Sequence, residues 1–180
     1  MRVISGKYRG LALKEFNVGG IRPTADRVKE SLFNILMSRV SGARALDLFC
    51  GSGSLGIECL SRGADFVHFN DASKESLNVA MSNIKKLSGV HDIQITRADY
   101  ADCLNSLKKP FDIIFIDPPY ADDCGIYALQ LISKLNLLTS GGVAVYERDR
   151  SFEGVIDGLE KYDERKYGKT YLSFFKKEEV

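Results

Sequence analysis

The chain has 180 residues, 44% of them hydrophobic and 27% charged, and a formal net charge of +1 at pH 7. This length and hydrophobic content fit one domain with a full core and exclude two large domains. The four cysteines include no C-x-x-C pair and there are only two histidines, so no metal site is expected. No apolar leader follows Met1 and no apolar run approaches about 18 residues, so we expect a cytoplasmic protein that is neither secreted nor membrane-spanning.

Positive charge gathers near the N-terminus. Residues 1–44 carry nine Lys and Arg against three acids, a net +6, whereas the other 136 residues, with 16 basic and 21 acidic side chains, are −5. A basic patch of this kind steers a protein toward phosphates even when the overall charge is near zero, and its contacts weaken as salt rises. Any one of these cations is as readily explained by a solvated surface, but the cluster indicates RNA contact. The candidates are Lys7, Tyr8, Arg9, Arg22 and Arg27, with Arg2, Lys14 and Lys29 also in the cluster.

The first predicted elements are two short strands, residues 2–5 and 11–14, which would form a basic hairpin around a turn at residues 7–10. Tyr8 lies in this turn between two basic side chains. Its ring either stacks on RNA or packs the hairpin onto the body of the protein, and the sequence leaves both alternatives open.

A helix is predicted after Thr24, which can cap its first turn. The helix is indicated by apolar residues at helical spacing, positions 28, 32, 35 and 36, which we expect to face the core. We assign residues 1–41 to an N-terminal extension and residues 42–180 to the main domain.

Strand-like and helix-like segments then alternate along the chain. Apolar runs bounded by turns predict five strands, with helices between them, at residues 44–49, 66–70, 92–97, 111–116 and 142–147. Such alternation is typical of a mainly parallel sheet covered by helices. The tail differs, because residues 162–166 and 170–176 flank a tight turn and predict an antiparallel hairpin. The expected fold class is therefore α/β and Rossmann-like, with an antiparallel last strand.

A glycine-rich loop follows the first of these strands, with the spacing G-x-G-x-x-G. Gly51 would permit a tight turn, Gly53 would let the backbone approach a ligand, and Gly56 would allow the next helix to pack closely on a strand. Asp71 follows Gly51 by twenty residues and could hold ribose hydroxyls. Nicotinamide enzymes share this pattern, so the loop alone leaves a nucleotide-binding module of the NAD type open.

Two further acids favour a different cofactor. Asp47, four residues before the first glycine, would repel a pyrophosphate but could pair with the ammonium group of S-adenosylmethionine. Asp99, at the end of the third predicted strand, could accept from an adenine N6 amine. Each acid taken singly is as well explained as a helix cap or turn residue. Together with Asp71 they indicate S-adenosylmethionine.

The tetrapeptide Asp117-Pro118-Pro119-Tyr120 ends the fourth predicted strand. The exocyclic amine of a base is a poor nucleophile, so a catalyst must hold its N–H bonds and turn its lone pair toward the methyl donor. Asp117 and the carbonyl of Pro118 could accept from the amine, and Tyr120 offers a stacking face. The alternative is a strand that simply ends in a proline turn.

In these motifs the sequence resembles the bacterial 16S ribosomal RNA guanine-N2 methyltransferases of the RsmD type. The resemblance spans nearly the whole chain and includes the glycine loop and residues 6–10, 22–30, 117–120 and 167–170. Two mild departures are Cys50, where alanine is frequent in the family, and Asp71, where glutamate is usual. The resemblance implies a seven-stranded class I methyltransferase sheet, S-adenosylmethionine as the cofactor of domain 42–180, and a catalytic site at Asp117, Pro118 and Tyr120.

The same resemblance implies a substrate. It is the N2 amine of a guanine in 16S ribosomal RNA, within the small subunit or an assembly intermediate, and we expect the enzyme to act as a monomer. A DNA adenine-N6 methyltransferase is the nearest alternative, because Asp-Pro-Pro-Tyr serves adenine amines equally well. Such enzymes usually carry a separate target-recognition region, for which 180 residues leave little room.

Overall fold

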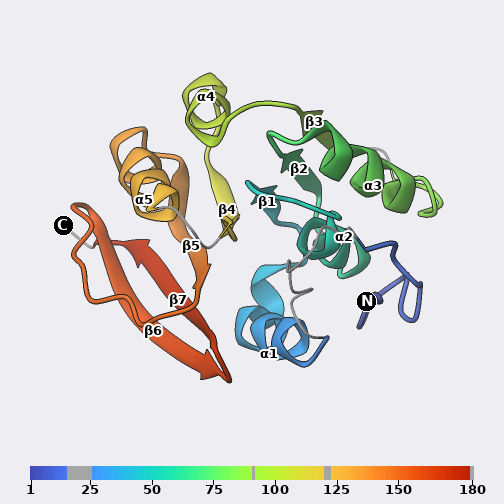
Figure 1. Cartoon of the computed structure of the whole chain (residues 1–180), viewed down its shortest axis with the longest axis horizontal. Helices are drawn as coiled ribbons and strands as arrows, with labels where there is room; N and C mark the ends of the chain where they lie inside the picture. Colours follow the sequence, from blue (N-terminus) through green and yellow to red (C-terminus); the bar gives the residue numbers. More distant parts are fainter. Residues whose placement is uncertain (16–25, 91, 120–122, 179–180) are drawn as a thin grey trace.

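Seven strands form one sheet in the computed structural model, which describes residues 1–15, 26–90, 92–119 and 123–178 (Figure 1). The strand order is β3-β2-β1-β4-β5-β7-β6. The strands are β1 (Arg44–Asp47), β2 (Phe66–Asn70), β3 (Ile93–Thr96), β4 (Phe111–Ile116), β5 (Leu138–Arg148), β6 (Leu159–Tyr167) and β7 (Thr170–Lys177). The helices are α1 (Asp26–Leu36), α2 (Ser54–Ser61), α3 (Lys74–Ile84), α4 (Tyr100–Ser106) and α5 (Cys124–Lys134), with a short 3-10 helix, η1 (Met37–Arg39).

The first five strands are parallel, and the tail forms the predicted hairpin. β7 lies between β5 and β6 and is antiparallel to both. The predicted fold class, a Rossmann-like seven-stranded sheet with an antiparallel last strand, is therefore confirmed. Strand ends differ from the prediction by a few residues, most at β5, which begins at Leu138 instead of residue 142.

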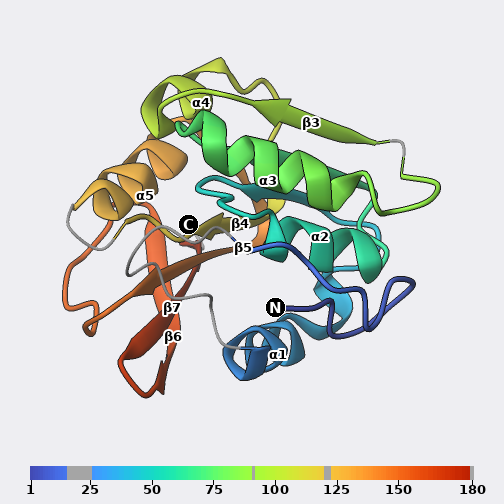
Figure 2. The same ribbon diagram turned by 45° about the vertical axis from the view of Figure 1, so that its right-hand side comes forward.

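Helices cover both faces of the sheet, because the central strands carry consecutive apolar residues whose side chains point alternately to one face and the other. On one face Ala45, Phe115 and Val145 pack in a cluster with α1, α2 and α3. On the other face Leu46 and Ile116 pack in a second cluster with α4 and α5. Figure 2 shows the two helix layers on opposite sides of the sheet. The carboxyl ends of the parallel strands consequently lie between two walls of helices, which is where open α/β sheets bind ligands.

The N-terminal segment differs from its prediction. The turn at residues 7–10 is present, but the strands expected at 2–5 and 11–14 are reduced to one antiparallel bridge, Arg2 to Ala12. The reason is that the backbone N–H groups of Ile4 and Ser5 donate to the carboxylate of Glu58 on α2 and not to a partner strand, at 2.8 and 3.0 Å. Val3 and Leu13 are buried in the same cluster as α1, α2 and α3, so this segment packs on the main domain.

Candidate active site

The glycine loop joins β1 to α2 with the predicted geometry. Gly53 caps α2 at φ 78°, a left-handed conformation that favours glycine. Gly56 lies against the ring of Phe69, and a Cβ built on it would approach that ring to 2.3 Å. The close packing of α2 on β2 therefore requires glycine at this position, as the spacing predicts.

Asp47 ends β1 beneath this loop and is only 2% exposed. Its Oδ2 accepts from the backbone N–H of Gly56 at 2.9 Å. Burial raises the pKa of Asp47 to about 7, with a smaller contribution from Asp71, while the Gly56 hydrogen bond opposes the shift. A cation that reached this carboxylate would favour its ionised form.

The other two predicted cofactor acids take local structural roles. Asp71 accepts from the backbone N–H groups of Gly51 and Ser73, at 2.9 and 2.8 Å, and so ties the glycine loop to the end of β2. Asp99 is exposed and caps α4 by accepting from Ala101 N at 2.9 Å. Each carboxylate oxygen has a second lone pair, so these bonds leave room for a ligand hydroxyl or amine.

Asp117 follows β4 directly and is half-buried, with Pro118 buried and Pro119 exposed beside it. Burial raises the pKa of Asp117 well above its usual range, and the carboxylates of Glu147 and Asp47 add to the shift. The predicted stacking residue, Tyr120, lies outside the described residues. Acidic groups from β1, β4 and β5 thus influence one another at the carboxyl edge of the sheet.

Sequence reasoning missed Glu147. This glutamate lies near the end of β5 and is 5% exposed, and its charge contributes to the raised pKa of Asp117. A signal was present, since an acid follows the apolar run at residues 143–146, in the manner in which Asp47 and Asp117 end their strands.

The predicted RNA-contacting residues divide into exposed cations and packed groups. Lys7, Arg9 and Arg27 are exposed, whereas Arg22 lies outside the described residues. Tyr8 is partly buried, packs against the hydrophobic cluster that contains α1 to α3, and donates its hydroxyl to Ser88 O. The packing alternative for Tyr8 is therefore observed, and stacking of its ring on RNA stays a prediction.

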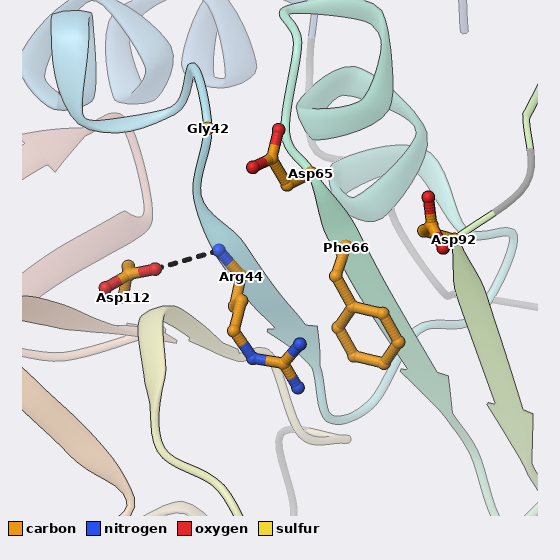
Figure 3. A pocket seen from close by; sticks show the side chains of 6 residues that line it. All are labelled: Gly42, Arg44, Asp65, Phe66, Asp92 and Asp112. Carbon is orange, nitrogen blue, oxygen red and sulfur yellow. Dashed lines mark hydrogen bonds between the residues drawn. The ribbon is translucent and has the colours of Figure 1, made fainter.

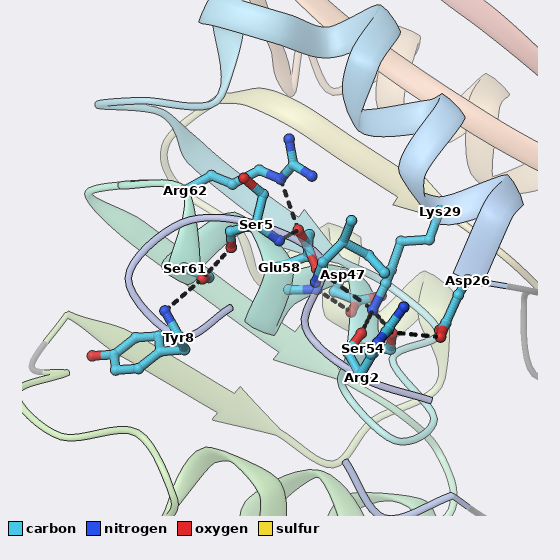
Figure 4. Close-up of polar contacts among 12 residues, drawn as sticks. Arg2, Ser5, Tyr8, Asp26, Lys29, Asp47, Ser54, Glu58, Ser61 and Arg62 are labelled. Carbon is cyan, nitrogen blue, oxygen red and sulfur yellow. Dashed lines mark hydrogen bonds and ion pairs between the residues drawn. The ribbon is translucent and has the colours of Figure 1, made fainter. Parts of the chain in front are cut away.

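Lys29 was grouped with the surface cations by sequence, and this assignment is wrong. Its side chain is fully buried, with Nζ 3.5 Å from Oε2 of Glu58. Nζ also donates to Arg2 O at 2.7 Å and Ser54 Oγ at 3.0 Å. Burial lowers the pKa of Lys29, and Glu58 opposes that shift. Figure 4 shows this network, in which Lys29 of α1 and Glu58 of α2 hold the N-terminal segment against the glycine loop.

A cavity of about 530 Å³ lies at the opposite, amino edge of the sheet (Figure 3). Its lining includes Arg44, Phe66 and Asp112. The Arg44 guanidinium stacks on Phe66 at 4.2 Å, and Asp112 accepts from Arg44 N and Thr139 Oγ1, both at 2.9 Å. These polar groups brace the strand starts, and the acids that end β1 and β4 lie at the other edge.

Within the described ranges, no group of three or more His, Cys, Asp or Glu is arranged to hold a metal ion. The helices of that same part of the chain include none long and apolar enough to cross a membrane.

Comparison with known proteins adds a family and relatives. Residues 1–176 match the family described as conserved hypothetical protein 95. The chain is 38% identical to the Bacillus subtilis protein named "Putative rRNA methyltransferase YlbH", over 98% of this chain and 99% of that protein. It is 36% identical to ribosomal RNA small subunit methyltransferase D of Haemophilus influenzae, over 83% of this chain and 79% of that protein.

A solved structure shares the whole fold. It is that of an Escherichia coli protein described as "Putative methyltransferase yhhF", with a TM-score of 0.88 and 27% identity, covering 99% of this chain and 98% of that one. The likeness includes the N-terminal segment as well as the seven-stranded sheet, since nearly all of both chains is aligned.

Proposed function

This chain belongs to the family described as conserved hypothetical protein 95, the RsmD family of ribosomal RNA methyltransferases, and from that premise we propose that it methylates the N2 amine of a guanine in 16S ribosomal RNA. The methyl donor is S-adenosylmethionine. The observation that carries the proposal is the position of Asp117 and Pro118 at the carboxyl end of β4, next to β1 with Asp47 and the glycine loop.

The chemistry of Asp47 fits this cofactor better than NAD. A buried carboxyl with a pKa of about 7 gains from a neighbouring cation, and S-adenosylmethionine offers an ammonium group. A dinucleotide site would present backbone donors near the start of α2 to a phosphate. Here the backbone N–H of Gly56 donates to Asp47 instead. Gly51 and Gly53 would let the backbone lie along the cofactor, Asp71 would hold its ribose, and Asp99 would accept from its adenine.

The chain's own groups then position the amine. Asp117 and the Pro118 carbonyl accept the two N–H bonds of the guanine amine, which turns its lone pair toward the methyl group that S-adenosylmethionine supplies. As the N–C bond forms, positive charge develops on nitrogen, and the Asp117 carboxylate stabilises it. Asp117 or water takes the surplus proton afterwards. Tyr120 keeps its predicted role of stacking on the base.

Basic side chains of the N-terminal residues hold the RNA. Lys7, Arg9, Arg22 and Arg27 contact phosphates, and the target base is unpaired or extruded so that it reaches Asp117. We expect the substrate to be the small subunit or an assembly intermediate, and the enzyme to act there as a cytoplasmic monomer. The DNA adenine and NAD-type alternatives are not favoured, because the relatives are named as ribosomal RNA methyltransferases.

The test is methyl transfer from labelled S-adenosylmethionine to small subunits that lack their native modifications, with duplex DNA in parallel, followed by nucleoside identification. N2-methylguanosine is expected, whereas N6-methyladenine from DNA would overturn the proposal. Replacing Asp117 with asparagine should lower the transfer rate by about 10² to 10³-fold and leave the affinity for S-adenosylmethionine within about twofold. Wild-type turnover in this variant would contradict the role given to Asp117.

A further inference from the structure

The carboxyl edge of the sheet continues from the ends of β1 and β4 into the hairpin of β6 and β7. Because β7 is antiparallel to β5, its first residues lie beside the last residues of β5, and the register pairs Tyr171 with Arg148. Tyr171 is also paired with Lys166, near the end of β6. The closed turn of the hairpin, at residues 167–170, therefore lies at the same edge of the sheet as Asp117.

Arg148, Tyr171 and Lys166 form one row on one face of the sheet, since directly opposed residues of paired strands project to the same side. Extending the register of β4 and β5 by two residues sets Pro118 beside Arg148. Backbones of paired strands are about 4.8 Å apart, so the three steps from Pro118 to Lys166 span roughly 14 Å. Two cations and an aromatic ring thus extend the edge sideways from the Asp-Pro-Pro-Tyr motif.

Arg148 brings a buried cation to this row. The residue is 8% exposed, and its guanidinium lies over the rings of Tyr146 and Phe152, 5.3 and 5.7 Å from their centroids. Among the described residues, its Nε has no hydrogen-bond partner. Burying a charge is unfavourable unless it is paired, so an enclosed guanidinium with an unused donor indicates an anion that binds beside it. The planar fork of arginine donors matches the oxygens of a phosphate.

Lys166 and Lys169 add exposed cations on either side of the hairpin turn. Nζ of Lys166 lies over the ring of Tyr171, 5.2 Å from its centroid. A hydrogen bond with the side chain of Tyr171 raises the pKa of Lys166, so this lysine stays charged at neutral pH. Tyr167 is partly buried against the cluster that contains α1 to α3, which fixes the turn on the body of the protein. Both lysines are therefore presented by an anchored element.

Several acids near this row are engaged within the protein. Asp163 pairs with Arg165 at 3.0 Å. Asp123 pairs with Arg150 at 3.5 Å. The two oxygens of Glu164 each accept from a serine hydroxyl at 2.6 Å. These contacts offset most of the negative charge beside the row, and its cations outnumber the exposed acid that directly follows β5.

The basic turn near the N-terminus is held elsewhere. The backbone N–H of Lys7 donates to Ser61 O at 2.7 Å, and Ser61 is the last residue of α2. The first residue of α2, Ser54, directly follows the glycine loop, and a helix of eight residues is about 12 Å long. Lys7 thus lies at the far end of α2, so the phosphates next to the methylated base meet other side chains.

We propose that Arg148, Lys166 and Lys169 bind the phosphate backbone of the RNA beside the extruded guanine. This inference rests on the proposed function and extends it, because it adds a second RNA-binding surface at the edge where the reaction takes place. Arg148 takes the phosphate nearest the base, since its neighbour in the row is Pro118, and the two lysines hold the backbone that follows. Such contacts carry no sequence information, but they set the register of the RNA on the enzyme.

The test compares two double variants that remove the same charge from opposite edges of the sheet. Lys166→Gln with Lys169→Gln changes the carboxyl edge, and Lys108→Gln with Lys109→Gln changes two exposed lysines just before β4, at the amino edge. Filter binding to small subunits that lack their native modifications is measured over a range of salt concentrations.

The carboxyl-edge variant should bind roughly tenfold to thirtyfold more weakly at about 0.1 M salt, because each phosphate contact with a single strand contributes about 0.7 to the slope of log K against log salt. Its slope should therefore be smaller by about 1.4. The amino-edge variant should keep the wild-type slope and an affinity within about twofold.

Arg148 is tested separately, by methyl transfer. Arg148→Met keeps a side chain that packs on the two rings and removes the charge, and it should lower kcat/KM for N2-methylguanosine formation by roughly tenfold to hundredfold. Arg148→Lys restores the charge without the planar fork and should recover part of the loss. The affinity for S-adenosylmethionine should stay within about twofold of the wild type in every variant.

The outcomes are distinguishable. A wild-type enzyme that makes no N2-methylguanosine overturns the proposed function and this inference with it. A wild-type enzyme that makes N2-methylguanosine, together with a carboxyl-edge variant that binds the subunit as tightly as the amino-edge variant does, overturns the inference alone, whether or not Arg148→Met folds. Weaker binding and a smaller salt slope in the carboxyl-edge variant, with the amino-edge variant unchanged, support it.

Discussion

Replacing Lys29 with methionine tests the buried ion pair between α1 and α2. Both side chains of the Lys29–Glu58 pair have 0% exposure, so solvent does not screen the interaction, and breaking such a pair by removing one partner typically costs about 3–5 kcal/mol. After the change, Glu58 still accepts from Arg62 at 2.8 Å and from two backbone N–H groups. We therefore expect a loss at the lower end, about 3 kcal/mol in the free energy of unfolding.

The assay is urea unfolding followed by circular dichroism, with a thermal scan in parallel. A loss of about 3 kcal/mol corresponds to a fall in Tm of roughly 6–12 °C for a chain of this size. Arg2→Ala is the matched control, because the Arg2–Asp26 pair is exposed and 3.7 Å apart, and it should change the free energy of unfolding by less than about 1 kcal/mol. If Lys29→Met lost no more than Arg2→Ala, the stabilising role of the buried pair would be refuted.

Four further predictions concern the cofactor loop and the basic segment. The affinity for S-adenosylmethionine should rise as pH increases through about 7, because Asp47 must ionise to pair with the ammonium group. Titration calorimetry across this pH range measures the affinity, and a pH-independent affinity would contradict the pairing. The pKa of Asp47 is raised in the folded state, so its contribution to stability is present at low pH and is lost as pH rises to about 7. The variant Asp47→Asn should therefore unfold at a higher temperature than the wild type at pH 8, and it should bind the cofactor more weakly. Gly56→Ala should cost about 1–3 kcal/mol in chemical denaturation, because the added methyl group meets the ring of Phe69, and wild-type stability would refute that contact. Changing Lys7, Arg9 and Arg22 together to alanine should weaken RNA binding and flatten its salt dependence without altering the affinity for the cofactor. Unchanged RNA binding in this triple variant would show that the basic segment does not contact the RNA.

The sequence by itself determined the elements whose signals are local. Apolar runs separated by helix-like segments predicted the parallel strands, and the tight turn at residues 167–169 predicted the hairpin of β6 and β7. The glycine spacing predicted the turn into α2 and the contact of Gly56 with β2, because a residue's φ and its lack of a Cβ are properties of that residue. Asp47 and Asp117 could be found because each directly ends an apolar run.

Only the tertiary structure decided which side chains meet across strands and helices. Lys29 carries the charge typical of a surface residue, and its burial follows from Glu58, which lies on another helix. The expected N-terminal strands do not form because the backbone N–H groups of Ile4 and Ser5 donate to Glu58, which is also distant in the sequence. Glu147 becomes the neighbour of Asp117 because β5 pairs with β4 in one register. Burial and charge pairing depend on groups distant in the chain, so no local pattern of residues encodes them.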